Sequence, residues 1–233
     1  DDLKALHLPA ENPFIPTDFT LYADAEQKTP SLILNDQHRR VWYYPEHEFS
    51  FPKSRVIVQL QQASVQNSAK ERLLAQLYAR TINEALNTYS YPASLAGLDY
   101  ALNATGRGLE LTIEGYQHKL PVLLERILQQ MQTLNLSEEQ FALYHASLQR
   151  MLENQLKNKP YERSLAELRQ WLYEPSFSEQ QLLQELASIS RADVLDFGKR
   201  FAQNLSVQMY VHGNFSKEQA LNIAALVQNY MPA

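Results

Sequence analysis

The sequence contains no cysteine and only 6 glycines among 233 residues. Without cysteine the chain can form no disulfide, no thiolate nucleophile and no cysteine-based zinc site. The glycines do not form a phosphate-binding loop, because Gly106 and Gly108 lack the third glycine and the following helix of that motif. The Gly-x-Ser-x-Gly motif of serine hydrolases is absent too. These absences exclude several common kinds of active site.

The sequence also lacks a block of like charges and a long apolar run. Lys and Arg number 21 against 26 Asp and Glu, giving a formal net charge of −5. Nucleic acid is therefore not an expected partner, because phosphate binding needs clustered cations. No apolar run approaches the ~18 residues of a membrane span. We expect no membrane partner, and the absence of an initial Met suggests a chain processed or excised from a longer one.

Two hydrophobic periods divide the chain into strands and helices. Alternating apolar residues predict strands at residues 31–35, 40–44, 56–60, 98–103, 109–114 and 207–212. Helical spacing predicts helices over residues 68–89, 120–134, 137–156, 162–173, 178–187, 192–203 and from Ser216 to Met231. Ser68, Ser137, Ser178, Ser190 and Ser216 are suitable N-caps. Pro92 is expected to stop the first long helix.

This order of elements predicts an α+β fold. A mixed, largely antiparallel sheet with helices packed on one face would bury the one-sided apolar patterns. Residues 25–233 show no second core and no repeat, so we expect a single domain there. Residues 1–24 contain Pro9, Pro13 and Pro16, which prevent regular structure, together with apolar side chains such as Phe14. We expect this segment to be a linker that lies extended against a protein surface.

The histidines form no local metal-binding motif. None of the six has another histidine within a helical turn. The densest group is Glu46-His47-Glu48; on a strand only its two glutamates would converge, and such a pair is usually solvated. His212, which precedes Gly213 at a strand end, has either a functional role or the commoner role of a capped turn.

Other candidates are carboxylates and tyrosines. Glu110 and Glu114, with Thr112 between them, would share one strand face, where they could contact a cationic peptide or act as acid and base. Because nothing converges with them, a solvated face is the favoured interpretation. A second group would suit either a peptide-contacting surface or the core: Tyr43, Tyr44, Tyr89 and Tyr91. We assign no catalytic and no metal-binding residue, and we leave the substrate-binding residues unassigned.

Three stretches resemble the insulinase/pitrilysin family of zinc metallopeptidases: residues 6–19 (LHLPAENPFIPTDF), residues 108–121 (GLELTIEGYQHKLP), and His212-Gly213-Asn214. The resemblance spans essentially the whole chain. Members of that family have four related α+β domains, arranged as two bowl-shaped halves that are joined by a linker and enclose a peptide chamber. This chain resembles the third domain, preceded by the end of the linker. The resemblance implies other domains of a parent chain and an oligopeptide substrate as partners.

The resemblance places the zinc outside this chain. The family motif His-x-x-Glu-His lies on a helix of the first domain, where two histidines and a distant glutamate hold the metal. The related helix here, residues 68–89, contains no histidine and only Glu71 and Glu84 as carboxylates. No ligand can be carried over. The resemblance therefore implies a domain that is inactive by itself, with no cofactor of its own and zinc in the catalytic domain of the parent.

We therefore expect a catalytically silent domain that helps to enclose the substrate chamber of a zinc metalloendopeptidase. Two alternatives remain: a structural or assembly domain of a non-peptidase relative, and a free-standing peptide-binding module. A His-x-x-Glu-His motif upstream of Asp1 would favour the peptidase. Bacterial relatives of the pitrilysin type are often periplasmic, so that location is expected, with the cytoplasm as the alternative.

Overall fold

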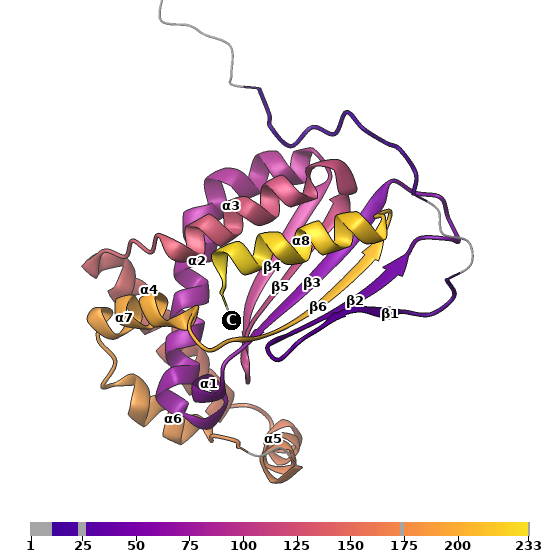
Figure 1. Cartoon of the computed structure of the whole chain (residues 1–233). Helices are drawn as coiled ribbons and strands as arrows, with labels where there is room; N and C mark the ends of the chain where they lie inside the picture. Colours follow the sequence, from indigo (N-terminus) through magenta and orange to yellow (C-terminus); the bar gives the residue numbers. More distant parts are fainter. Residues whose placement is uncertain (1–10, 23–26, 173–174, 233) are drawn as a thin grey trace, which may run out of the picture.

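The computed structural model describes residues 11–22, 27–172 and 175–232, and it is built around one six-stranded sheet. The strands are β1 (Ser31–Asn35), β2 (Arg39–Pro45), β3 (Lys53–Gln61), β4 (Leu98–Thr105), β5 (Gly108–Tyr116) and β6 (Ser206–Gly213). Their order across the sheet is β1-β2-β6-β3-β5-β4 (Figure 1). Only the β2–β6 pair is parallel; the other pairs are antiparallel. The last strand in the sequence thus lies in the middle of the sheet.

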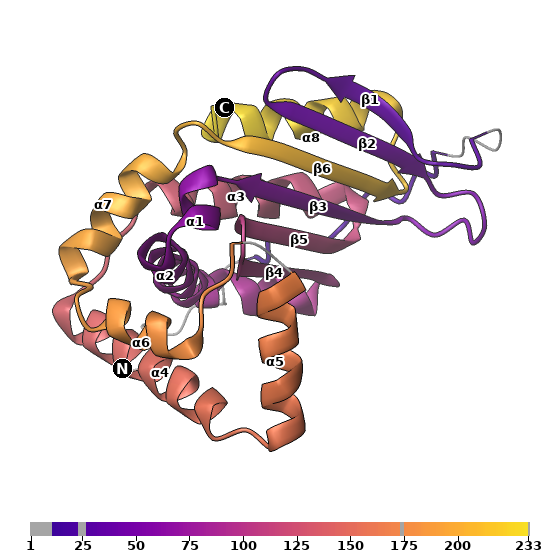
Figure 2. The same ribbon diagram turned by 90° about the horizontal axis from the view of Figure 1, so that it is seen from below.

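Most of the helices lie in two layers on one side of the sheet. Their bounds are α1 (Ala63–Asn67), α2 (Ala69–Leu95), α3 (Leu120–Gln132), α4 (Glu138–Leu156), α5 (Pro160–Leu172), α6 (Glu179–Leu186), α7 (Arg191–Phe201) and α8 (Lys217–Tyr230), with a short 3₁₀ helix η2 at Gln117–Lys119. Helices α2 and α3 pack on β4 and β5, and α8 packs on β1 and β2. Helices α4, α6 and α7 pack on α2, and α5 stands apart from them (Figure 2). The predicted α+β fold with helices on one face is confirmed (Figure 1).

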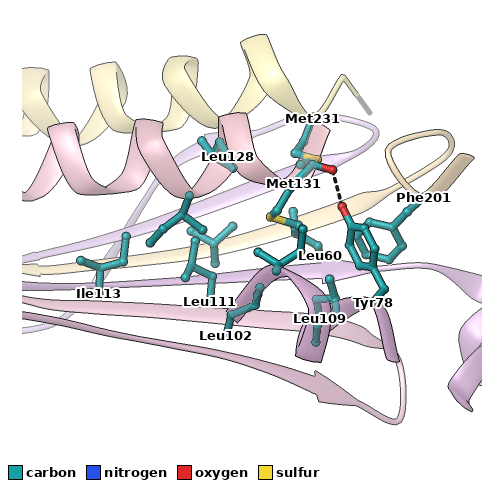
Figure 3. Packing of buried hydrophobic residues seen from close by; sticks show 14 of the residues in the cluster. Leu60, Tyr78, Leu102, Leu109, Leu111, Ile113, Leu128, Met131, Phe201 and Met231 are labelled. Carbon is teal, nitrogen blue, oxygen red and sulfur yellow. Dashed lines mark hydrogen bonds between the residues drawn. The ribbon is translucent and has the colours of Figure 1, made fainter. Parts of the chain in front are cut away.

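The core lies between the sheet and these helices. Alternate residues of the central strands, such as Val56, Val58 and Leu60 of β3, are completely buried. Figure 3 shows these strands below α3, with Tyr78 of α2 at one end of the buried side chains. The Tyr78 hydroxyl donates to the carbonyl of Met131, which belongs to the last turn of α3 and has no partner within its own helix. Burial raises the pKa of Tyr78, so this hydroxyl stays protonated as the donor.

Local sequence signals set the starts of the helices. Ser137, Ser178, Ser190 and Ser216 each accept a hydrogen bond from a backbone N–H three residues on. In each case the side chain at that third position also bonds back to the serine N–H, which completes a capping box. Ser68 caps α2 through the N–H of Glu71. The predicted N-caps are therefore confirmed.

The prediction that Pro92 stops α2 is wrong. The helix continues to Leu95 with Pro92 in its last turns. Beyond the proline, Ala93 is buried, and the Pro92 carbonyl accepts a hydrogen bond of 2.7 Å from the Asn12 side chain. Gly97 then ends the helix with φ of +74°, a conformation that favours glycine. Helices α1 and η2 were not predicted from the sequence.

Residues 11–22 lie against this domain. Phe14 is only 2% exposed. The imidazole Nδ1 of His118 accepts the N–H groups of Thr17 at 3.1 Å and Asp18 at 3.2 Å. Asn214 holds the next part of the segment with two hydrogen bonds of 2.7 Å, to the Thr20 carbonyl and from the Tyr22 N–H. The expected boundary between residues 24 and 25 falls outside the described residues and stays a prediction.

Candidate functional site: the open face of the sheet

The face of the sheet opposite the core carries mostly polar and aromatic side chains. We call it the open face. Side chains line it in three rows that the strand register brings side by side. The rows are Tyr44–His212–Arg55–Glu114–Asp99, Trp42–Tyr210–Ile57–Thr112–Ala101 and Arg40–Gln208–Gln59–Glu110–Asn103. In Figure 2, α3 and α8 lie behind the strands, so they do not cover this face.

Four rings form an aromatic stack at one end of the open face: Tyr44, His47, Tyr210 and His212. The His212 ring lies parallel to Tyr44, with centroids 5.2 Å apart, and to Tyr210, with centroids 6.0 Å apart. Its Nδ1 donates to the Tyr44 carbonyl at 3.0 Å, which fixes the ring. His47 meets Tyr44 edge-on at 5.3 Å. The stack is a partly exposed aromatic surface of the kind that peptide-binding sites use.

Exposed aromatic rings also lie on this face and in the loop after β2. Trp42, beside Tyr210 in the sheet, is 41% exposed. In the loop after β2, Phe49 and Phe51 are 66% and 60% exposed and stack on each other at 6.2 Å. Large exposed rings at neighbouring positions mark a contact surface better than a single exposed ring does.

The two candidate glutamates of β5 lie on the open face but are occupied by neighbours. Glu114 forms an ion pair of 3.4 Å with Arg55, and both side chains are about half exposed. Glu110 accepts a hydrogen bond of 2.9 Å from the Gln59 amide. Each carboxylate has its own partner, so nothing in this geometry makes them an acid–base pair. The favoured solvated interpretation fits this arrangement, with Thr112 between them on the same face.

The Glu46-His47-Glu48 group lies in a loop, because β2 ends at Pro45. The strand geometry assumed from the sequence is therefore wrong here. The Glu46 carboxylate accepts the N–H groups of Glu48 at 2.6 Å and Phe49 at 2.8 Å. Burial opposes the charge on Glu46, but these hydrogen bonds and nearby His212 keep its pKa below the usual value. Throughout the described parts of the chain, no three His, Asp or Glu side chains gather as metal ligands.

The four tyrosines grouped in the sequence separate in space. The Tyr43 side chain is buried in the core, and its hydroxyl donates to the Phe215 carbonyl at 2.7 Å. Tyr44 belongs to the aromatic stack. Tyr89 lies under the guanidinium of Arg126, with 4.1 Å from the ring centroid to Cζ, and Tyr91 is 69% exposed. Only Tyr44 contributes to the open face.

Sequence reasoning missed Trp42 and Tyr210 as members of this surface. The signal was present, because both occupy the outward positions of strands whose inward positions are apolar. The solvated face of a sheet is usually polar, so two aromatic residues at neighbouring outward positions indicate a contact surface. None of the described helices is both long and apolar enough to cross a membrane.

Comparisons with known proteins agree on one family. The family model described as the middle or third domain of peptidase M16 matches residues 1–185. The putative zinc protease mug138 of Schizosaccharomyces pombe is 33% identical over 227 residues, which cover 96% of this chain and 23% of that protein. The insulin-degrading enzyme of Bos taurus is 29% identical over 224 residues, covering 95% of this chain and 22% of the enzyme.

A solved structure shows the same fold. The crystal structure of pitrilysin superimposes with a TM-score of 0.89 at 29% identity, covering 98% of this chain and 24% of pitrilysin. The chain thus spans less than a quarter of the length of these relatives. The family-model match covers well over half of the 233 residues. On these grounds the chain belongs to the M16 peptidase family and corresponds to its middle or third domain.

Proposed function

We propose that this chain is a catalytically silent domain of a zinc metalloendopeptidase, and that its open face forms part of the wall of a peptide-substrate chamber. The observation that carries the proposal is the open face itself. A sheet whose second face bears an aromatic stack and rows of polar side chains offers a broad surface for an extended peptide. Membership of the M16 family supports the peptide as the ligand.

The residues of this chain do not fit a zinc site of the family kind. Helix α2, the counterpart of the family's zinc-binding helix, has no histidine. Glu71 on that helix is bound to Arg200 by two hydrogen bonds of 2.7 and 2.8 Å. The zinc of the proposed peptidase therefore belongs to another domain of the larger protein.

A silent domain contributes to hydrolysis by positioning. A peptide held at the right place loses less freedom on reaching the reactive geometry, and this lowers the barrier by several kcal/mol in favourable cases. The open face supplies ring surfaces for side chains and amide groups, such as those of Gln59 and Gln208, for the peptide backbone. We infer that it selects which oligopeptides are retained, without cutting them.

The proposal is tested in the full-length protein with an internally quenched fluorescent oligopeptide. Trp42→Ala removes an open-face ring and is expected to raise KM about fivefold with kcat unchanged, because the contact is made equally in the ground and transition states. Leu143→Ala is the matched control, since Leu143 is 60% exposed on α4, away from the sheet. Equal KM values for the two variants would contradict the proposal.

Absence of peptide hydrolysis by the wild-type protein would instead favour the assembly-domain alternative. We also propose that the peptidase is periplasmic, because the chain is similar to pitrilysin. Cell fractionation distinguishes this location from the cytoplasmic alternative.

We further propose that α5 contacts another domain of the larger protein. Four residues form one apolar stripe on α5, with 51 to 67% of their surface exposed: Tyr161, Leu165, Leu168 and Leu172. No side chain of α5 whose burial is described is buried, and in Figure 2 the helix stands apart from α4 and α6. An isolated amphipathic helix of this length is marginal in water. The relatives are more than four times as long as the matched region, so other domains are available to cover the stripe.

A further inference from the structure

A hollow of about 450 Å³ lies at the end of the open face where the β4–β5 hairpin turns. Gln59 and Gln61 of β3 line it on the sheet. Arg72 of α2, Arg107 at the hairpin tip and Ser176 in the connection between α5 and α6 line it as well. The hollow is therefore continuous with the surface that we assign to peptides.

Arg72 is a half-buried cation whose hydrogen-bonding capacity is only partly used. Its Nη2 lies 3.3 Å from the Gln66 carbonyl and 3.4 Å from the carbonyls of Gly106 and Pro175. This nitrogen carries two hydrogens, so the three long contacts cannot all be full hydrogen bonds. The Nε group is buried without a partner, and Nη1 has none among the described residues.

No carboxylate of the described residues forms an ion pair with Arg72 or Arg107. The plane of the Arg72 guanidinium is instead held by the Phe177 ring, 4.7 Å from Cζ to the centroid. Burial lowers the pKa of Arg72, as expected for a cation without an opposite charge beside it. The opposite charge that this site lacks would be supplied by a ligand.

We propose that Arg72 and Arg107 form an anion site that takes a carboxylate group of a peptide lying on the open face. A guanidinium matches a carboxylate with two parallel N–H···O bonds, and a partly desolvated guanidinium binds it more strongly than one in water does. Beside this pair, the Gln61 amide donates to Gln59 Oε1 at 3.2 Å, and its own oxygen suits a peptide N–H next to that carboxylate. The source is either the C-terminus or an acidic side chain.

This inference rests on the proposed function only in assigning peptides to the open face. The test is an NMR titration of the 233-residue chain, which has its own continuous core, monitored at the amides of Gln61 and Gly106. Three probes separate the sources: Ac-Ala-Ala-Ala with a free carboxylate, the same peptide as its amide, and Ac-Ala-Glu-Ala-amide. Inorganic phosphate is a fourth probe, an anion that carries no peptide.

At least one carboxylate probe is expected to bind about tenfold or more tightly than the neutral amide, because charged hydrogen bonds are lost in the latter. Arg72→Gln and Arg107→Gln should each abolish most of this difference, whereas Arg150→Gln, an exposed arginine on α4, should retain it. The Arg107 side chain is exposed, so Arg107→Gln remains informative if Arg72→Gln unfolds the chain.

Equal binding of the carboxylate and amide peptides, or binding of phosphate alone, would overturn the anion-site inference. These results leave the Trp42→Ala experiment untouched, so failure of the anion site and failure of the proposed function are distinguishable. Tighter binding of a carboxylate probe than of the amide peptide, together with no peptide hydrolysis by the full-length protein, would support the anion site and contradict the peptidase function.

Discussion

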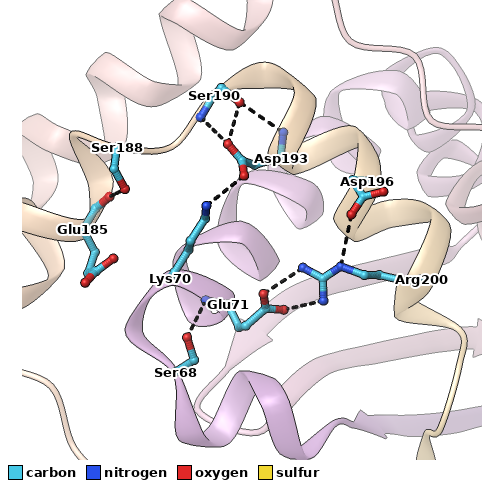
Figure 4. Close-up of polar contacts among 9 residues, drawn as sticks. All are labelled: Ser68, Lys70, Glu71, Glu185, Ser188, Ser190, Asp193, Asp196 and Arg200. Atoms are coloured by element: carbon cyan, nitrogen blue, oxygen red, sulfur yellow. Dashed lines mark hydrogen bonds and ion pairs between the residues drawn. The ribbon is translucent and has the colours of Figure 1, made fainter.

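Asp193 connects the start of α7 to the start of α2. Its carboxylate accepts the N–H of Ser190 at 2.9 Å, as part of the capping box, and lies 2.8 Å from Lys70 Nζ (Figure 4). Figure 4 also shows Glu71, the next residue of α2, paired with Arg200 of the same α7. Two neighbouring residues of α2 are thus linked to the two ends of one helix.

The hydrogen bonds from Lys70 and Ser190 hold the pKa of Asp193 well below its usual value. A carboxyl whose pKa is lower in the folded state stabilises the fold above the unfolded-state pKa, and this contribution is lost as the pH falls. Asp193→Asn is therefore expected to lower the free energy of unfolding by about 1 kcal/mol at pH 7. The difference from wild type should shrink as the pH drops below about 4. Urea unfolding at pH 7 and pH 3 measures both values.

Asp99→Asn serves as the control, because Asp99 is exposed on the edge strand β4. It should behave as wild type at both pH values. A destabilisation by Asp193→Asn that stays equal at pH 3 and pH 7 would show that the charge of Asp193 is not the cause.

At the scale of elements, α5 gives the clearest test of a missing partner. Leu168 is 53% exposed on the apolar stripe, and Glu167 is an exposed neighbour on the other side of the helix. In the isolated chain, Leu168→Ser and Glu167→Ser are both expected to change the free energy of unfolding by less than about 0.5 kcal/mol. In the full-length protein, only Leu168→Ser should lower Tm, because only Leu168 would be buried by another domain.

Calorimetry of both variants, each in the isolated chain and in the full-length protein, gives the four stabilities to be compared. A loss of stability from Leu168→Ser in the isolated chain as large as in the full-length protein would contradict the inter-domain contact. It would mean that the stripe is covered from within this chain.

The elements differ in how far the sequence predicts them. Capping boxes are local, so Ser137 and Ser216 were enough to place two helix starts. The continuation of α2 past Pro92 depends on the hydrogen bond from Asn12, eighty residues away, and on the burial of Ala93. A local sequence rule contains neither of these contacts. Tertiary packing thus overrides the proline penalty.

The open face was less predictable than the fold, because its rows join distant parts of the sequence. Tyr44 and His212 are direct neighbours only because β6 pairs with β2. Alternation identified which residues of each strand face outward, but it carries no information about which strands are adjacent. His47 and His212 lie far apart in the sequence, and only the strand order brings His212 beside Tyr44, which also contacts His47.

At the scale of the molecule, β6 joins two otherwise separate parts of the sheet. It pairs with β2 on one side and with β3 on the other, so the β1–β2 hairpin and the β3–β5–β4 unit have no direct hydrogen bonds to each other across the sheet. The matched family segment, residues 1–185, ends before β6 begins. A fragment of this extent would lack β6 with its core side chain Val211, and it would leave the facing edges of β2 and β3 without partners.

We therefore expect residues 1–185 alone to show no cooperative urea transition and to lose near-ultraviolet circular dichroism. Addition of a synthetic peptide of residues 186–233 should restore both signals, since it supplies β6 and α8. The intact chain is the reference. A sigmoidal transition of the fragment with the midpoint of the intact chain would contradict this role of β6.

The central position of β6 also has a consequence for biosynthesis. During translation, β2 and β3 leave the ribosome long before the strand that separates them, and no native pairing can join the two parts until residue 213 has emerged. For that interval the nascent polypeptide carries bare strand edges, which are prone to pair with other chains. A chaperone that shields those edges until synthesis passes β6 would therefore favour the correct sheet over aggregation.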